Sequence, residues 1–144
     1  MAREDPHNLQ RFLEAQEPVI DAVIEELRAG RKRSHWMWFV FPQVEGLGRS
    51  RMAERYAIAS AAEASAYLDH PTLGRRLREC TGLVNAVDAD SAKAVFGTPD
   101  NRKFQSAMTL FEAVADDPTP FTTALQRYFD GERDQETLEF LQDA

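Results

Sequence analysis

The amino-acid sequence predicts an all-α fold, and three features of the chain support this prediction. Apolar residues recur at three- and four-residue steps through most of the 144 residues, the spacing that places them on one face of an α-helix. No alternation of polar and apolar residues is long enough to predict a strand within a sheet. Length and composition, with 43% hydrophobic and 28% charged residues, are typical of one soluble globular domain. We therefore predict a single helical domain over residues 1–144, with an ordered core at about 8–142.

The first helical stretch covers residues 8–30 and is divided by a proline. We expect Pro18 in the first turn of a second helix, where its missing N–H is harmless. Gly30 is expected to end that helix, because glycine is the usual residue just past a helix C-terminus.

The segment WMWFVF at residues 36–41 contains both tryptophans of the chain. A lone strand would leave its backbone groups without partners, so a short buried helix or an extended segment enclosed by helices is more plausible. Burial of such large side chains stabilises by roughly 1.5 to 3 kcal/mol or more each. The predicted core includes Trp36, Trp38, Phe39, Phe41, Leu77, Leu83, Met108 and Phe111.

Beyond a turn-prone stretch at residues 42–50, the helical periodicity resumes. Ser60 and Glu63 have the spacing of a capping box, and His70 precedes a proline where a capping or turn role is expected. Further helices are predicted at 50–59, 60–68, 71–87, 91–96, 101–115, 119–129 and 134–142.

Charge and composition narrow the classes of function. A net charge of −7 opposes broad nucleic-acid binding, which depends on excess positive charge. Basic residues cluster at 28–33 and 75–78, so a local anionic ligand is still possible. Apolar runs are too short to span a membrane, and the N-terminus lacks the pattern of a secretory signal. With a single cysteine, Cys80, the expected compartment is the cytoplasm.

Three phrases of the sequence are similar to a known family. LRAGRKRSHWMWFVFPQVEGLGRS, YAIASAAEASAYLDHPTLGRRL and FGTPDNRKFQSAMTLF resemble the bacterial and fungal family called domain of unknown function 1810, from about Leu9 to Phe129. The resemblance implies a compact multihelical fold with a short buried central helix, and it implies no activity. Many relatives have serine at the position of Ala107, which puts a role that needs a hydroxyl there in doubt, whereas Ser106 keeps its hydroxyl.

The same phrases supply a candidate ligand site. Polar residues stand beside bulky apolar ones, where a core would have to satisfy them at a cost of roughly 1 to 3 kcal/mol each. We expect them to converge around a pocket, with Arg31 or Arg33 at its mouth as anion-binding residues. The candidate ligand-binding residues are His35, Trp36, Trp38, Gln43, Asp100, Lys103 and Ser106.

A structural interpretation of these residues stays open beside the functional one. Asp100 would cap a helix beginning near Asn101, and Ser106 can return a hydrogen bond to the preceding turn. No nucleophile-elbow pattern surrounds Ser106 or Cys80, and core packing is the common fate of a lone cysteine. No two His or Cys side chains have metal-ligand spacing, so we expect no metal and no cofactor.

Two functions are compatible with this pattern. The first is a small-molecule domain, binding or hydrolytic, whose aromatic walls and basic rim suit a planar anionic ligand such as a nucleotide or an ADP-ribose derivative. The alternative is a helical protein-interaction module with no catalytic activity, in which the aromatic segment is entirely core.

Overall fold

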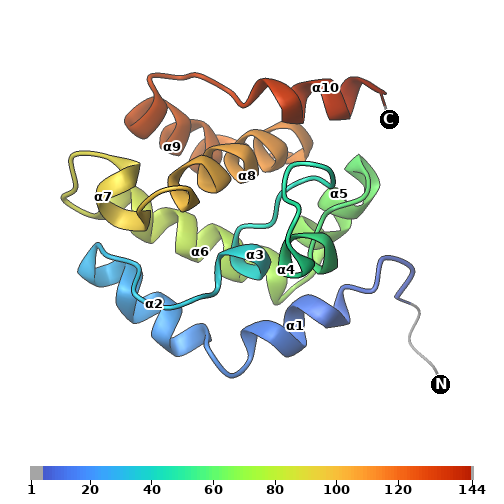
Figure 1. Cartoon of the computed structure of the whole chain (residues 1–144), viewed down its shortest axis with the longest axis horizontal. Helices are drawn as coiled ribbons and strands as arrows, with labels where there is room; N and C mark the ends of the chain where they lie inside the picture. The colour runs from blue at the N-terminus through green and yellow to red at the C-terminus, as the bar shows by residue number, and fades with distance from the viewer. Residues whose placement is uncertain (1–4, 144) are drawn as a thin grey trace.

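The computed structural model describes residues 5–143, and its α-helices pack into one domain (Figure 1). The predicted all-α fold is confirmed: within these residues the only β-type pairing is an isolated parallel bridge between Val44 and Ile58. None of the helices in this part of the chain has the length and apolar content needed to span a bilayer. The helices are α1 Gln10–Gln16, α2 Ile20–Ala29, α3 Met37–Val40, α4 Arg51–Arg55, α5 Ala61–Asp69, α6 Leu73–Ala86, α7 Ala92–Phe96, α8 Asp100–Val114, α9 Thr119–Phe129 and α10 Gln135–Asp143.

The helices form layers around α6 and α8. In Figure 1, α1 and α2 lie on one side, α8, α9 and α10 lie on the opposite side, and α6 runs between them. Helix α6 packs against α2, α5 and α9, while α8 packs against α5, α7, α9 and α10. Every residue from 106 to 111 of α8 is buried, because neighbours cover this helix on all sides.

Helix α3 is the short buried helix that the sequence predicts. Trp36 and Phe41, which flank it, are buried together with three of its four residues. So short a helix leaves most of its carbonyl groups without partners within the helix. The carbonyl of Phe39 instead accepts hydrogen bonds from Gln16 Nε2 at 2.7 Å and from the Tyr67 hydroxyl at 3.2 Å. Helices α1 and α5 therefore fix the position of α3 with buried polar groups.

Aromatic side chains join α3 to α7 and α8. The Phe41 ring meets Phe104 edge-on, with 5.1 Å between ring centroids, and Phe96 edge-on at 5.9 Å. Phe96 and Phe104 stack at 4.7 Å. The centre of the Trp36 ring lies 6.2 Å from that of Phe41. These contacts place the start of α8 directly beside the end of α3.

Local capping follows the sequence prediction at three positions. Gly30 ends α2 with a φ of 81°, a left-handed conformation that costs glycine little. The Ser60 hydroxyl accepts from the N–H of Glu63 at 3.1 Å. The Glu63 carboxylate accepts a hydrogen bond from the N–H of Ala59, just before the helix, and also pairs with Arg11 at 2.7 Å. His70 Nδ1 accepts from two backbone N–H groups at the start of α6.

Three details of the sequence prediction are wrong. Pro18 lies in the turn between α1 and α2, since the N–H of Val19 bonds to the carbonyl of Gln16 at 3.0 Å and delays the start of α2. Trp38 and Leu83 are only partly buried at the edge of the core. Helix α4 ends at Arg55, because the chain after it extends to pair with residues 43–45.

Candidate functional site

Two lysines from distant parts of the sequence share the carboxylate of Asp100. Lys32 Nζ lies 2.9 Å from Asp100 Oδ2, and Lys103 Nζ lies 3.3 Å from Oδ1. The Lys32 side chain is 8% exposed and that of Lys103 is 23% exposed, so the first pair is structural and the second is open to solvent. The expected helix cap by Asp100 is therefore wrong: α8 begins at Asp100 itself, and its carboxylate turns to the lysines rather than to the backbone.

Each of these lysines also lies over a tryptophan. The ammonium of Lys32 is 5.2 Å from the centre of the Trp36 ring, and that of Lys103 is 5.2 Å from the centre of the Trp38 ring. Such cation–π contacts hold a cation against an aromatic face. Trp36 is 0% exposed, whereas Trp38 is half-buried. Of the two tryptophan rings, only that of Trp38 can therefore touch a ligand, and the Lys103 ammonium lies beside it.

Glu26 on α2 organises the segment that leads into α3, a role that the sequence did not suggest. Its Oε1 accepts from the N–H groups of Arg33 and Ser34, at 2.6 and 3.0 Å, and from the indole N–H of Trp36 at 3.0 Å. Its Oε2 accepts from the Ser34 hydroxyl at 2.6 Å. Partial burial opposes ionisation, but these four hydrogen bonds outweigh it and lower the pKa of Glu26 to about 2.

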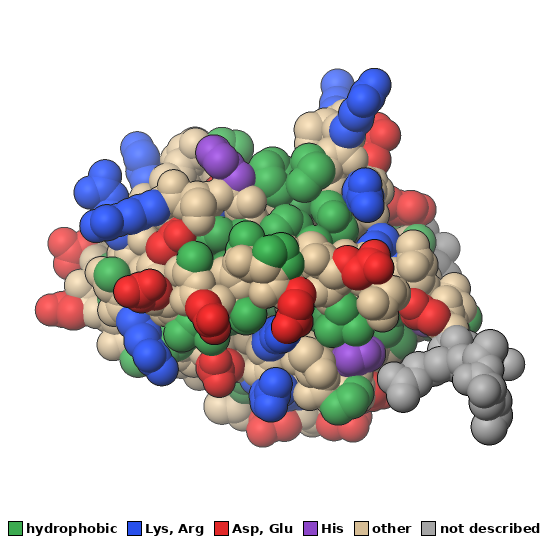
Figure 2. All heavy atoms as spheres, turned by 90° about the horizontal axis from the view of Figure 1, so that it is seen from below, with side chains coloured by type: hydrophobic (Ala, Val, Ile, Leu, Met, Phe, Trp, Pro, Cys, Tyr) green, Lys and Arg blue, Asp and Glu red, His purple; other side chains and the backbone are tan. Residues whose placement is uncertain are grey.

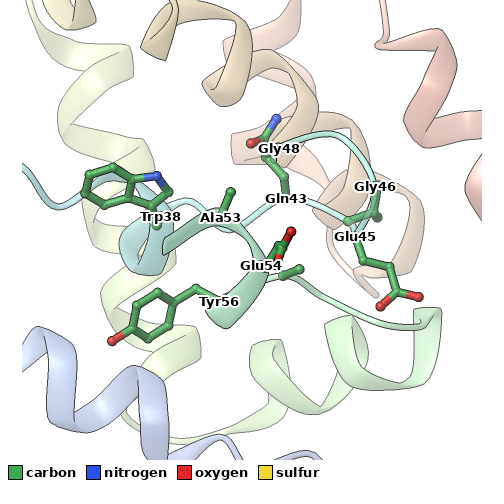
Figure 3. Close-up of a pocket in the computed structure, with 10 residues that line it drawn as sticks. Trp38, Gln43, Glu45, Gly46, Gly48, Ala53, Glu54 and Tyr56 are labelled. Atoms are coloured by element: carbon green, nitrogen blue, oxygen red, sulfur yellow. The ribbon is translucent and has the colours of Figure 1, made fainter. Parts of the chain in front are cut away.

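A small cleft opens beside Trp38 between the 43–48 loop and α4. Its volume is about 130 Å³, enough for several water molecules. Gly48 lets the loop lie close to α4, since a Cβ there would clash with the Cβ of Ala53. The residues that line the cleft are Trp38, Gln43, Val44, Glu45, Gly46, Gly48, Ala53, Glu54, Tyr56 and Ala57 (Figure 3).

Polar groups in this cleft are available to a ligand. The Gln43 amide, the Glu54 carboxylate and the indole N–H of Trp38 are in none of the hydrogen bonds or ion pairs within residues 5–143. Figure 3 shows the Gln43 and Glu54 side chains pointing to the same side, with the nitrogen-bearing edge of Trp38 turned toward them, while Glu45 points away. The cleft therefore offers a donor, an acceptor and an amide that serves as both.

Basic side chains stand at the border of the cleft. Lys103 covers Trp38, as described above, and the Arg55 guanidinium lies 5.6 Å from the centre of the Tyr56 ring. Figure 2 shows hydrophobic side chains reaching the surface as a group on one face, with Lys and Arg side chains on both sides of it. Cations therefore stand beside two of the aromatic rings that line the cleft, Trp38 and Tyr56, while the charged side chains that line it are the exposed carboxylates of Glu45 and Glu54.

The structure brings together part of the candidate set. Trp38 and Gln43 line the cleft, and Lys103 with Asp100 adjoins it through the Trp38 ring. Trp36 is buried one layer deeper. The Ser106 hydroxyl donates to the carbonyl of Arg102 at 3.1 Å, the backbone bond that the structural interpretation expects.

The other candidate residues lie on the surface. Arg31, Arg33 and His35 are exposed on the segment that Glu26 holds. No ion pair or side-chain hydrogen bond within the described residues joins these three side chains to the cleft. Sequence reasoning missed Glu54 and Tyr56, because nothing in the sequence indicates that the chain after α4 returns to the 43–45 strand-like segment.

Nucleophilic chemistry finds little support in the geometry. Burial, with a smaller contribution from the Glu79 charge, raises the pKa of the Cys80 thiol to about 12, and this side chain is 0% exposed in the core. The Ser106 hydroxyl donates to the carbonyl of Arg102 at 3.1 Å, and within the described residues no hydrogen bond joins it to a His, Asp or Glu side chain. In the same part of the chain, no group of three or more His, Cys, Asp or Glu side chains could hold a metal ion.

Fold and cleft together define a small helical protein with a half-exposed tryptophan beside a polar cleft. The chain belongs to the family described as "Protein of unknown function (DUF1810)", whose model matches residues 6–141. It is similar to the crystal structure of the conserved hypothetical protein Rv1873 from Mycobacterium tuberculosis, with 54% identity and a TM-score of 0.94, over 96% of this chain and 99% of that one. Among proteins with curated descriptions, none matches significantly.

Proposed function

We propose that this protein binds a small planar molecule with an anionic end, of the nucleotide or ADP-ribose kind, at the cleft beside Trp38. The observation that carries the proposal is the half-exposed Trp38 ring, which has the Lys103 ammonium 5.2 Å from its centre and borders a cleft with unpartnered polar groups. A flat ring can lie against the indole, and the ammonium can meet a phosphate or carboxylate at the edge of that ring.

The size of the cleft decides how such a ligand would sit. Pockets that enclose a drug-sized ligand measure about 300 to 1,000 Å³, and this cleft measures about 130 Å³. One ring system fits inside, and the remainder of the ligand would lie over the basic border. The Lys103 ammonium has three N–H groups and pairs with only one oxygen of Asp100, Oδ1. It therefore keeps donors for that part of the ligand.

Binding is better supported than hydrolysis. The buried Cys80 thiol, with its pKa near 12, cannot serve as a nucleophile at neutral pH. We therefore place a binding role ahead of a hydrolytic one, and ahead of a protein-interaction module without a ligand. The expected setting is the cytoplasm, on the sequence features given above.

Fluorescence tests this proposal directly. Acrylamide should quench Trp38 and spare Trp36, and a bound nucleotide should protect Trp38. Lys103→Ala should weaken binding about tenfold while changing stability little, and Arg102→Ala is the matched control, since Arg102 is the exposed neighbour on the same helix. Unchanged quenching of Trp38 with a panel of nucleotides and ADP-ribose at millimolar concentration would contradict the proposal.

A further inference from the structure

We infer that the cleft recognises guanine, with the Glu54 carboxylate accepting hydrogen bonds from N1–H and the 2-amino group while the ring lies against Trp38. This inference rests on the proposed function and names the base that the cleft would select. It rests on the chemistry of Glu54 and Gln43, which the proposal for an anionic planar ligand leaves unexplained.

A carboxylate in the cleft selects against many ligands. Glu54 lines the cleft, and its carboxylate belongs to none of the ion pairs within residues 5–143. An ionised carboxylate accepts hydrogen bonds and donates none. A ring edge that presents acceptors, such as N1 of adenine, would face Glu54 lone pair to lone pair, and a bare anion would be repelled.

Guanine presents the matching edge. Its N1–H and 2-amino group are adjacent donors, and two parallel donors suit the two oxygens of one carboxylate. Its O6 is an acceptor beside them. The Gln43 amide, which points to the same side of the cleft as Glu54 (Figure 3), can donate to O6. The cleft then supplies one donor, the Gln43 amide, for O6, and two acceptors, the Glu54 oxygens, for N1–H and the 2-amino group.

The charges around the cleft agree with a guanine nucleotide. The exposed carboxylate of Glu54 lines the cleft, Glu45 lines it too but points away (Figure 3), and Lys103 over Trp38 and Arg55 over Tyr56 stand at the border. A simple cation would satisfy the carboxylate and be repelled at the border, while a simple anion would meet the opposite conflict. A donor-rich base with phosphates attached satisfies both regions, and the volume of about 130 Å³ admits the base alone.

Calorimetric titration with GMP, AMP and free arginine separates the possibilities. We expect GMP to bind at least tenfold more tightly than AMP, and arginine to bind weakly. Glu54→Gln should weaken GMP binding by about ten- to a hundredfold, the effect of losing hydrogen bonds to a charged group. It should not weaken AMP binding and should strengthen it, because the glutamine amide can donate to N1 of adenine. Glu14→Gln, an exposed carboxylate on α1, is the matched control and should change neither.

The outcomes distinguish this inference from the proposed function. If AMP binds as tightly as GMP, or if the Glu54→Gln variant binds GMP as tightly as the parent protein does, the inferred selection of guanine is wrong while nucleotide binding stands. If arginine binds as tightly as GMP, the cleft is a cation site and the inference is overturned. If neither nucleotide binds and Trp38 remains quenchable with both, the proposed function fails, and the inference fails with it.

Discussion

Replacing Glu26 by glutamine tests how the segment before α3 is held. The carboxylate accepts four hydrogen bonds, at 2.6, 3.0, 2.6 and 3.0 Å, from Arg33, Ser34 and the Trp36 indole. Hydrogen bonds to a charged group contribute about 1.5 to 3 kcal/mol and neutral ones about 0.5 to 1.5. Glutamine keeps an acceptor but loses the charge and the acceptor for the Ser34 hydroxyl. We expect Glu26→Gln to lower the free energy of unfolding at pH 7 by about 1 to 2 kcal/mol.

The pH dependence of this effect has a definite direction. The pKa of Glu26 is about 2 in the folded chain, against 4.5 for the unperturbed side chain. Because folding lowers this pKa, ionised Glu26 stabilises the protein fully above about pH 4.5, and the contribution is lost as the pH falls from there toward 2. Solvent screening reduces the free energy that a half-exposed group contributes, which is why the expected loss stays at about 1 to 2 kcal/mol.

Urea denaturation at pH 7 and at pH 3 measures both effects. The difference between the parent protein and Glu26→Gln should be largest at pH 7 and should shrink at pH 3. Glu25→Gln on the same helix is the control. Because Glu25 is exposed, this variant should shift the midpoint of the urea transition little at either pH. A Glu26→Gln protein as stable as the parent at pH 7, within about 0.5 kcal/mol, would refute the assigned role.

Two other predictions concern the core. Trp36→Ala should lower the free energy of unfolding, measured in urea, by about 3 to 5 kcal/mol, the range for a buried aromatic side chain. Trp38→Ala should lower it clearly less, because Trp38 is half-buried. Equal losses in the two variants would contradict the assigned burial. Cys80, with its pKa raised to about 12 by burial, should react with a thiol reagent at pH 8 only on unfolding, and complete labelling of the native protein within minutes would show that the site opens.

Much of the fold could be predicted from the sequence because its causes are local. Helical periodicity depends on the spacing of apolar residues, and the positions of Gly30, Ser60 and His70 act on backbone groups within a few residues. Burial of residues 36–41, with the exception of Trp38, could be predicted from hydrophobicity alone. These features need no knowledge of which helix meets which.

Only the tertiary structure decided the site, because its contacts join residues that are far apart in sequence. Asp100 looks like a helix cap until Lys32 is brought to 2.9 Å from it. Whether Trp36 or Trp38 faces solvent depends on how α1, α7 and α8 enclose a four-residue helix. Glu54 enters the cleft because the chain after α4 turns back to pair with residues 43–45. Sequence spacing carries information about neighbours along one helix, whereas ion pairs and clefts depend on the packing of several, which the sequence pattern alone does not specify.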